Sequence, residues 1–378
     1  MASHHSILND PEGPVRHVVC ELSGGNELYS APERALSEAW DYARIRLMKD
    51  IPLYPLRFEP IFEYRLWGGR RLASLLATPL PGVGPIGEAW ILSDRDEHSS
   101  VVADGTLKGT TIRQLMERSG DRLLGSLSGQ FARFPLLLKF LDVTKRLSVQ
   151  VHPSDRHKEL IPPGDTGKDE AWVVLAEGPD ACIYAGLKAG SSAQGLRQAI
   201  VNGTVPDQLT SFAPQLGDGV FIPAGTVHSL SDVMVFEVQE NSDVTFRLYD
   251  WDHIDPRTGR RRPLQVDKAI ACIDFQQGAI RPLTPLIEAT KPVLRENLVQ
   301  CDHFRVTRLT GEGPFVIGKA GAPRTLVCLE GNGQLHHAGT NYSYGKGDLL
   351  LLSAEVGACS CRPHGVTSVL EISLPEVA

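Results

Sequence analysis

Four stretches between Lys139 and Asp252 decide the fold: KFLDVTKRLSVQVHPSD (139–155), GKDEAWVVLAEG (167–178), GDGVFIPAGTVHSL (217–230) and QENSDVTFRLYDWD (239–252). Each contains a short run of β-branched and aromatic residues bounded by proline, glycine or polar residues, the pattern of a β-strand. In the first stretch apolar and polar residues alternate, so Ser148, Gln150 and His152 share one face of a strand. Gln150 and His152 then lie ~7 Å apart along the backbone. The stretches therefore predict strands that present polar side chains together.

Four residues in these strands have the chemistry of a metal site: Gln150, His152, Glu170 and His228. Two imidazoles, a carboxylate and an amide oxygen leave coordination positions open, as in a catalytic site, and they suit Fe(II) or Mn(II) as well as zinc. A lone histidine on a strand is more often structural. However, the spacing G-x5-P-x-G-x2-H from Gly217 to His228 resembles the second signature of cupin barrels. The first cupin signature, His-x-His followed by Glu, reads Gln-x-His followed by Glu here.

The Gln-x-His variant resembles the type I mannose-6-phosphate isomerases, cupin-superfamily enzymes, and further motifs follow in family order. These motifs are LWGG (66–69), GEAWILS (87–93), FPLLLKFLD (134–142), GKDEAW (167–172), IPAGTVHSL (222–230) and NSDVTFRLYD (241–250). The resemblance implies that one Zn²⁺ per chain is bound by Gln150, His152, Glu170 and His228. It also implies active-site roles for Arg247, Lys139, Lys168 and Asp243. One departure, GKDE in place of Lys-Pro-Glu or Lys-Thr-Glu, leaves the lysine and the glutamate in place.

The resemblance implies an intramolecular oxidoreductase that interconverts D-mannose 6-phosphate and D-fructose 6-phosphate through a cis-enediol. We expect an electrostatic role for Arg247, because its guanidinium stays protonated. Lys139 and Lys168 would bind phosphate or transfer protons, and Asp243 would orient Arg247 or join in proton transfer. The sequence does not identify the base. Two alternatives stay open: a non-catalytic sugar-binding cupin, and another metal-dependent cupin enzyme.

The composition sets limits on partners and location. With 378 residues, of which 42% are hydrophobic, the chain is long enough for two domains. Its net charge of −7 argues against a nucleic-acid partner. The sequence has no apolar run of ~20 residues and no signal-peptide pattern, which predicts a cytoplasmic protein with no membrane partner. A sugar phosphate is the expected partner, and the oligomeric state is left open, a monomer included.

We expect a mainly β fold of two cupin-type jelly-roll barrels, with helical insertions in and around the first. Residues 1–50 form an extension with a helix over 32–50, unless translation starts at Met48, the alternative we favour. Residues 51–290 form the metal-binding catalytic domain, and residues 291–378 form a second cupin-like domain that lacks metal ligands. Helices are predicted over 108–130, capped by Thr110 or Thr111, and over 191–203, starting at a serine cap. A linker is predicted over 276–296.

The C-terminal part contains a faint repeat of the first barrel. Aligning the Gly-Asp pairs places Ala358 at the position of His228. Aligning the Glu-Gly pairs places Pro323 at the position of Glu170.

Two charged features are ambiguous. Glu88 lies in a family motif, but a surface salt bridge explains it equally well. The basic run 257–263 could hold a phosphate, but a charge run is more often a solvated face, which is the interpretation we prefer.

Overall fold

The computed structural model describes residues 7–8, 17–19, 28–29 and 51–375. The helix predicted over 32–50 and the proposed start at Met48 therefore lie outside the described residues. The chain divides into two units, Met1–Pro52 and Leu53–Ala378. In the first unit three short strands pair in the order β1-β2-β3: β1 (Ile7–Leu8), β2 (His17–Val19) and β3 (Leu28–Tyr29).

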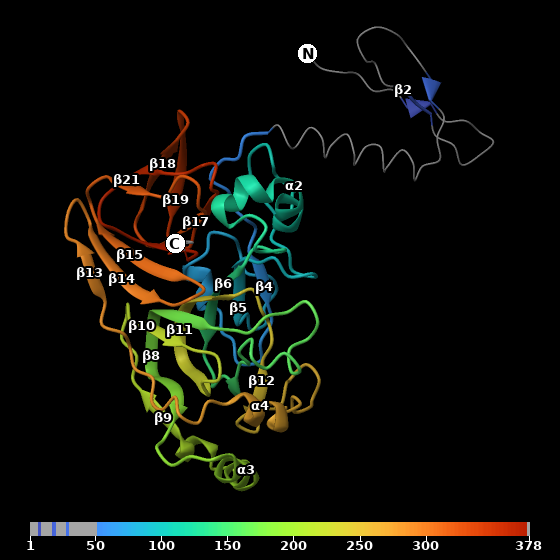
Figure 1. Cartoon of the computed structure of the whole chain (residues 1–378), viewed down its shortest axis with the longest axis vertical. Helices are drawn as coiled ribbons and strands as arrows, with labels where there is room; N and C mark the ends of the chain where they lie inside the picture. Colours follow the sequence, from blue (N-terminus) through green and yellow to red (C-terminus); the bar gives the residue numbers. More distant parts are fainter. Residues whose placement is uncertain (1–6, 9–16, 20–27, 30–50, 376–378) are drawn as a thin grey trace. The chain divides into compact units, whose positions relative to one another are not determined.

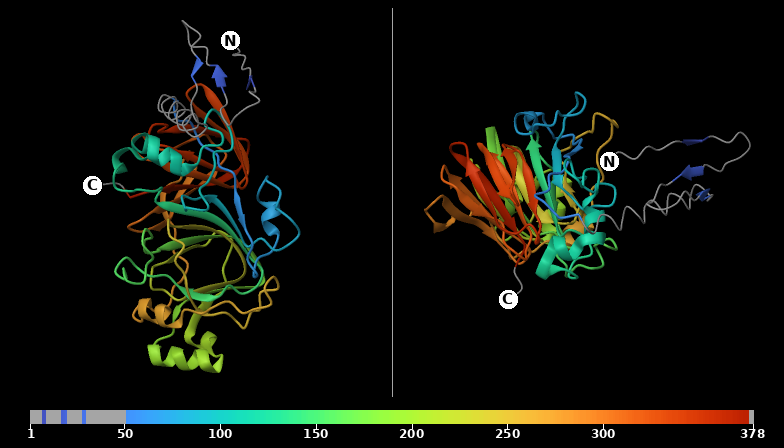
Figure 2. Two further views of the ribbon diagram at one scale, coloured as in Figure 1. Left: turned by 90° about the vertical axis from the view of Figure 1, so that its right-hand side faces the viewer. Right: turned by 90° about the horizontal axis from the view of Figure 1, so that it is seen from above.

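The second unit is mainly β, as predicted, and its first large sheet carries the candidate site. Six strands of this sheet follow the order β10-β8-β11-β6-β5-β4, while β7 and β12 pair beside β11, and β9 pairs with β8. Figure 2 shows that the sheet is curled. Its strands are β4 (Ile61–Glu63), β5 (Glu88–Leu92), β6 (Leu136–Val143), β7 (Val149–Val151), β8 (Glu170–Leu187), β9 (Leu209–Phe212), β10 (Gly219–Ile222), β11 (His228–Glu240) and β12 (Phe246–Tyr249).

The remaining strands form a six-stranded sheet, β13-β14-β15-β22-β17-β20, and a four-stranded sheet, β16-β21-β18-β19. Both lie toward one end of this unit (Figure 1). Their strands are β13 (Leu286–Ala289), β14 (Leu294–Gln300), β15 (Arg305–Gly311), β16 (Phe315–Ile317), β17 (Arg324–Glu330), β18 (Asn332–His337), β19 (Thr340–Gly345), β20 (Leu349–Leu352), β21 (Cys359–Pro363) and β22 (Thr367–Ser373). The linker predicted over 276–296 is wrong in its second half, which contains β13 and the start of β14. β13 is an exposed edge strand, so its sequence lacks the alternation that marks a half-buried strand.

The two large sheets have the same strand order, since β10-β8-β11-β6-β5-β4 corresponds to β20-β17-β22-β15-β14-β13 strand for strand. Both also carry a bulge at the same place: Leu175 in β8 and Leu329 in β17 are each passed over in the pairing. The register places Arg324, not Pro323, at the position of Glu170. The Glu-Gly pairs used for the sequence alignment lie beyond the bulge. An alignment on these pairs is therefore shifted by one residue relative to the strand pairing before the bulge.

Helices cover the ends of this unit. α2 (Ile112–Leu124) starts with a capping box between Thr111 and Gln114, and α3 (Ala193–Asn202) is capped by Ser192, so both predicted helices are confirmed. A short α4, which the sequence did not predict, and three 3₁₀ turns complete the set: α4 (Val266–Cys272), η1 (Arg71–Ser74), η2 (Gly125–Leu127) and η3 (Val205–Gln208). In Figure 1, α3 and α4 lie at the end opposite the second large sheet. In the described part of the chain, no helix combines the length and apolar character needed to cross a membrane.

Candidate active site

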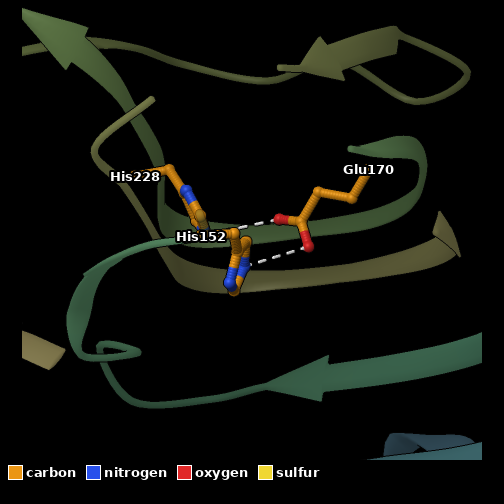
Figure 3. Close-up of side chains that lie close together, drawn as sticks. All are labelled: His152, Glu170 and His228. Atoms are coloured by element: carbon orange, nitrogen blue, oxygen red, sulfur yellow. Dashed lines mark ion pairs between the residues drawn. The ribbon is translucent and has the colours of Figure 1, made fainter. Parts of the chain in front are cut away.

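Three strand ends of the first sheet bring His152, Glu170 and His228 together. His152 directly follows β7, Glu170 is the first residue of β8, and His228 is the first residue of β11. The two carboxylate oxygens of Glu170 each face one imidazole: Oε2 lies 3.2 Å from His152 Nε2, and Oε1 lies 3.2 Å from His228 Nε2 (Figure 3). All three side chains are at most 1% exposed. Their ligand atoms lie within 4.8 Å of one another, close enough to share one metal ion.

The outer ring nitrogens fix the tautomer of both histidines. Nδ1 of His152 lies 2.8 Å from the carbonyl oxygen of Val244, and Nδ1 of His228 lies 2.9 Å from that of Thr226. A carbonyl only accepts, so each Nδ1 donates a proton and each Nε2 keeps its lone pair. Burial, together with the charge of Lys168, lowers the pKa of His152 to about 3, and burial lowers the pKa of His228. Both rings are therefore neutral and oriented as metal ligands commonly are.

Glu170 is ionised despite its burial. Burial alone would raise its pKa, but the charge of Lys168 opposes burial most strongly, and the pKa lies well below the usual range. Lys168 Nζ lies 2.7 Å from Oε2 of Glu170 and 3.1 Å from His152 Nε2. Apart from this contact of Oε2 with Lys168, neither carboxylate oxygen has a hydrogen-bond donor among the described residues. Carboxylate oxygens that face imidazole lone pairs at 3.2 Å are acceptors against acceptors, an arrangement that a bound cation stabilises. The donor set fits a metal ion.

Gln150, the fourth predicted ligand, lies beside this cluster with its amide nitrogen inward. Its Nε2 is 3.2 Å from His228 Nε2, while its oxygen accepts a hydrogen bond from the Ser148 hydroxyl at 3.2 Å. A half-turn of the amide plane exchanges the two atoms without moving the backbone. The structure thus places Gln150 within reach of the cluster and does not itself present the oxygen.

A cavity of about 410 Å³ adjoins the cluster, and Gln150 and Lys168 line it. On its wall Lys139 is buried, with Nζ 3.4 Å from Glu237 and 4.8 Å from the centre of the Trp90 ring. The carboxylate of Asp243 lies 4.0 Å from Lys139 Nζ. Asp243 therefore pairs with Lys139, and among the described residues it forms no ion pair with Arg247, the residue that one of its two predicted roles would have it orient.

Arg247 differs from the other cations of this cavity. Its Nε donates to the Ser148 hydroxyl at 3.3 Å and its Nη1 to the carbonyl oxygen of Pro263 at 3.0 Å. Among residues 51–375 it has no carboxylate partner, whereas the other lysines and arginines on the cavity wall all form ion pairs. Burial, and then the nearby Arg262, lower the pKa of Arg247. Its charge is therefore available to an anion in the cavity.

Sequence reasoning left the role of Glu88 open between a place near the site and a surface salt bridge, and the structure places it on the cavity wall. Glu88 is 8% exposed, pairs with Arg65 at 2.9 and 3.1 Å, and accepts from the Trp90 indole at 2.7 Å, so the interpretation as a surface salt bridge is wrong. Burial opposes ionisation of Glu88, but Arg65 and Lys139 lower its pKa to about 2.

Two more polar groups of the cavity wall come from other parts of the chain, and sequence reasoning missed the second, Glu237. Arg262, from the basic run interpreted as solvated, pairs with the buried Asp250 and lines the cavity. Glu237 accepts from the Trp172 indole at 3.0 Å. Its one sequence signal is a single charge inside the apolar run MVFEV (234–238).

The curled sheet, the buried His–Glu–His cluster and the charged cavity define a β-fold enzyme with a candidate metal centre. A family model for the catalytic domain of type I phosphomannose isomerase matches residues 56–170. The chain is 34% identical to the mannose-6-phosphate isomerase ManA of Bacillus subtilis over 304 residues, 80% of this chain and 94% of that protein. It is 32% identical to a mannose-6-phosphate isomerase of Streptococcus mutans over 300 residues, 79% of this chain and 92% of that protein.

Solved structures agree with these similarities. A crystal structure of a mannose 6-phosphate isomerase from Bacillus subtilis has a TM-score of 0.77 at 29% identity and covers 84% of this chain and 99% of its own. A mutant phosphomannose isomerase from Salmonella typhimurium, at 16% identity, shares the fold with a TM-score of 0.69 and covers 86% of this chain and 100% of its own. The chain belongs to the type I mannose-6-phosphate isomerase family and is an enzyme of the isomerase class, which confirms the resemblance found in the sequence.

Proposed function

We propose that this chain interconverts D-mannose 6-phosphate and D-fructose 6-phosphate, with one Zn²⁺ held by His152, Glu170, His228 and the amide oxygen of Gln150. The observation that carries the proposal is an ionised, buried Glu170 facing two unprotonated imidazole nitrogens, beside a cavity with an uncompensated guanidinium. The names of the relatives supply the substrate. When bound, the metal would act as a Lewis acid that polarises the oxygens of the substrate.

The reaction moves one hydrogen from C2 to C1 and one hydroxyl proton from O2 to O1, through a cis-enediol. The chain must therefore hold the sugar, stabilise negative charge that develops on its oxygens, and exclude bulk water. Arg247 suits the phosphate or the developing enediolate, because no carboxylate of the described residues neutralises it and its guanidinium stays protonated.

The other predicted residues act on the same cavity. Lys139 lies between Glu237 and Asp243, so it couples two carboxylates that could exchange protons with the sugar. Lys168 faces Glu170, and the negative charges of Glu170 and Glu237 outweigh burial and raise its pKa. Lys168 therefore serves as a fixed positive charge beside the cluster rather than as a base.

We also propose that the two large sheets belong to two cupin-type barrels, with the boundary before β13 (Leu286–Ala289) rather than at residue 290, because β13 pairs with β14. The shared strand order and the matching bulges support this division. In this scheme the first barrel carries the catalytic site, and the second has lost the ligands.

A coupled spectrophotometric assay of mannose 6-phosphate conversion tests the proposal, with metal content measured on the same protein. We expect turnover that is abolished by chelation and restored by zinc. If the metal-loaded protein binds the ion stoichiometrically but shows no conversion, the isomerase assignment fails. A sugar-binding role would then be preferred.

A further inference from the structure

The loop 153–167 connects two residues of the candidate active site, since it begins directly after His152 and ends directly before Lys168. Its path therefore decides where both side chains enter the site. Near its end the carboxylate of Asp165 forms a two-point ion pair with the guanidinium of Arg95: Oδ1 lies 2.9 Å from Nη1, and Oδ2 lies 2.8 Å from Nη2. Only 18% of the Arg95 side chain and 8% of the Asp165 side chain are exposed. This pair fixes the end of the loop, because a planar fork of donors matches a carboxylate in one orientation.

The same guanidinium holds a second segment, the turn 241–245 between β11 and β12. Nη1 of Arg95 also donates to the carbonyl oxygen of Asn241 at 2.8 Å. Further along this turn, the carbonyl oxygen of Val244 accepts the Nδ1 proton of His152, the contact that fixes the tautomer of that ring. Arg95 therefore contacts both the loop that follows His152 and the turn that orients it.

The loop and the turn are also bonded to each other. The hydroxyl of Ser242, a fully buried residue, donates to the carbonyl oxygen of Thr166 at 2.9 Å. Ser242 directly precedes Asp243 of the cavity wall. Thr166 lies just before Lys168 in the chain. With the contacts of Arg95, this bond closes a ring of three segments: the loop, the turn and the segment that follows β5.

We infer that Arg95 is a positioning residue of the candidate active site, which holds His152 and Lys168 in place through the loop and the turn. Among residues 51–375, the lining of the cavity of about 410 Å³ includes neither Arg95 nor Asp165, so the pair acts through these segments and not by contact with a substrate. Arginine is needed because its planar fork bonds two segments at once, which the ammonium group of a lysine on a flexible stem does not reproduce. The inference rests on the proposed function, since zinc binding and isomerisation are its readouts.

Arg308 offers a matched control on the second large sheet. Its guanidinium also pairs with a carboxylate, that of Glu296, and also donates to a backbone carbonyl of another segment, that of Gly217, each at 2.9 Å. The exposed fractions are similar, 19% for the Arg308 side chain and 13% for that of Glu296. In the described part of the chain, the lining of the candidate active-site cavity includes none of these three residues. Arg95→Lys and Arg308→Lys therefore remove the same kinds of contact, one set beside the site and one set away from it.

Competition titration with a chromophoric zinc chelator, the coupled assay at saturating zinc and urea denaturation compare the two variants with the wild type. Loss of an outer partner of a metal ligand lowers metal affinity or activity by about 10–100-fold, and Arg95 acts one contact beyond such a partner. We therefore expect Arg95→Lys to weaken zinc binding by about 10-fold and to lower kcat by about 10-fold. Arg308→Lys should leave both values unchanged, with a loss of stability like that of Arg95→Lys.

Ser242→Ala is a second, milder variant in case Arg95→Lys folds poorly, because it removes one neutral hydrogen bond between the same loop and turn. It should weaken zinc binding in the same direction. Weaker zinc binding and lower kcat in Arg95→Lys and Ser242→Ala, but not in Arg308→Lys, support the inference. The inference is overturned if Arg95→Lys and Ser242→Ala bind zinc as tightly as the wild type, or if Arg308→Lys weakens zinc binding equally. A zinc-loaded wild type without isomerase activity would refute the proposed reaction instead, and the zinc affinities alone would then decide the role of Arg95.

Discussion

Arg247 and Arg262 both line the candidate active-site cavity, and replacing each by alanine should produce opposite phenotypes. Arg247 has no carboxylate partner among residues 51–375, and its two described side-chain contacts are with the neutral groups of Ser148 and Pro263. Truncation therefore removes positive charge from the cavity and leaves no buried counter-charge. Loss of one preorganised donor to a transition state lowers kcat by about 10²–10³-fold. The neutral contacts contribute only about 1 kcal/mol each to the free energy of unfolding.

Arg262→Ala should act mainly on stability. Its guanidinium holds the carboxylate of Asp250 through two contacts, at 2.9 and 2.5 Å, and Asp250 is 7% exposed. Removing one partner of a buried ion pair costs about 3–5 kcal/mol, because the other charge is left without compensation. We expect the free energy of unfolding to fall by that amount, and kcat of the folded fraction to fall by less than about 10-fold.

Three measurements on the two variants and the wild type separate these effects: the coupled assay with mannose 6-phosphate, urea denaturation, and metal content. For Arg247→Ala we expect low kcat with normal stability and normal metal content. For Arg262→Ala we expect low stability with a nearly normal kcat of the folded fraction. If Arg247→Ala retains kcat within about threefold, or loses stability as Arg262→Ala does, Arg247 is structural and the charge argument is refuted.

Three further predictions concern the metal, the pH dependence and the core. His228→Ala should bind zinc at least ~100-fold more weakly, since even outer-shell partners of a ligand are worth about 10–100-fold; equal affinity by competition titration would exclude the site. Burial raises the pKa of Glu240 from 4.5 to about 8, so the folded state holds this proton more tightly and stability falls as pH rises between those values. Glu240→Gln should flatten that slope in urea denaturation at several pH values, and an unchanged slope would contradict the assignment. Truncation of Phe140 to alanine should lower the free energy of unfolding by about 3–5 kcal/mol, because its ring is fully buried and lies 5.4 Å from that of Phe236. A loss below about 1 kcal/mol would show that the core there is loosely packed.

Three of the four candidate ligands, His152, Glu170 and His228, could be predicted from sequence because each lies at the start or end of a strand. His152 precedes Pro153, and His228 follows the turn at Gly225, so local turn chemistry marks both places before any pairing is known. The helix caps were predictable for the same reason: Thr111 and Ser192 act within their own turn of chain. Strand ends and caps depend on local conformation, and the sequence carries that information directly.

The supporting charges could not be predicted in this way, because their partners are set by the register of the sheet. Glu237 meets Lys139 only because β11 pairs with β6, almost a hundred residues earlier in the chain. Arg262 reads as part of a solvated basic run, and its contact with Asp250 depends on how the chain turns after β12. The sequence displays the charge of such a residue but not the neighbour that compensates it.

The two large sheets show how such compensation changes while the strand order is kept. Glu237 and Glu371 hold the same position in the repeat, yet the cation that neutralises each comes from a different strand. Lys139 of β6 pairs with Glu237, whereas its counterpart Thr307 is neutral and Arg295 of β14 pairs with Glu371. A buried carboxylate is stable only with a compensating charge. Glu371 faces the neutral Thr307 instead of a lysine, so its compensating cation comes from a neighbouring strand. Strand order and bulges are held by packing of the whole sheet, but charges are compensated pair by pair, so the pairs differ between the two sheets while the strand order is the same.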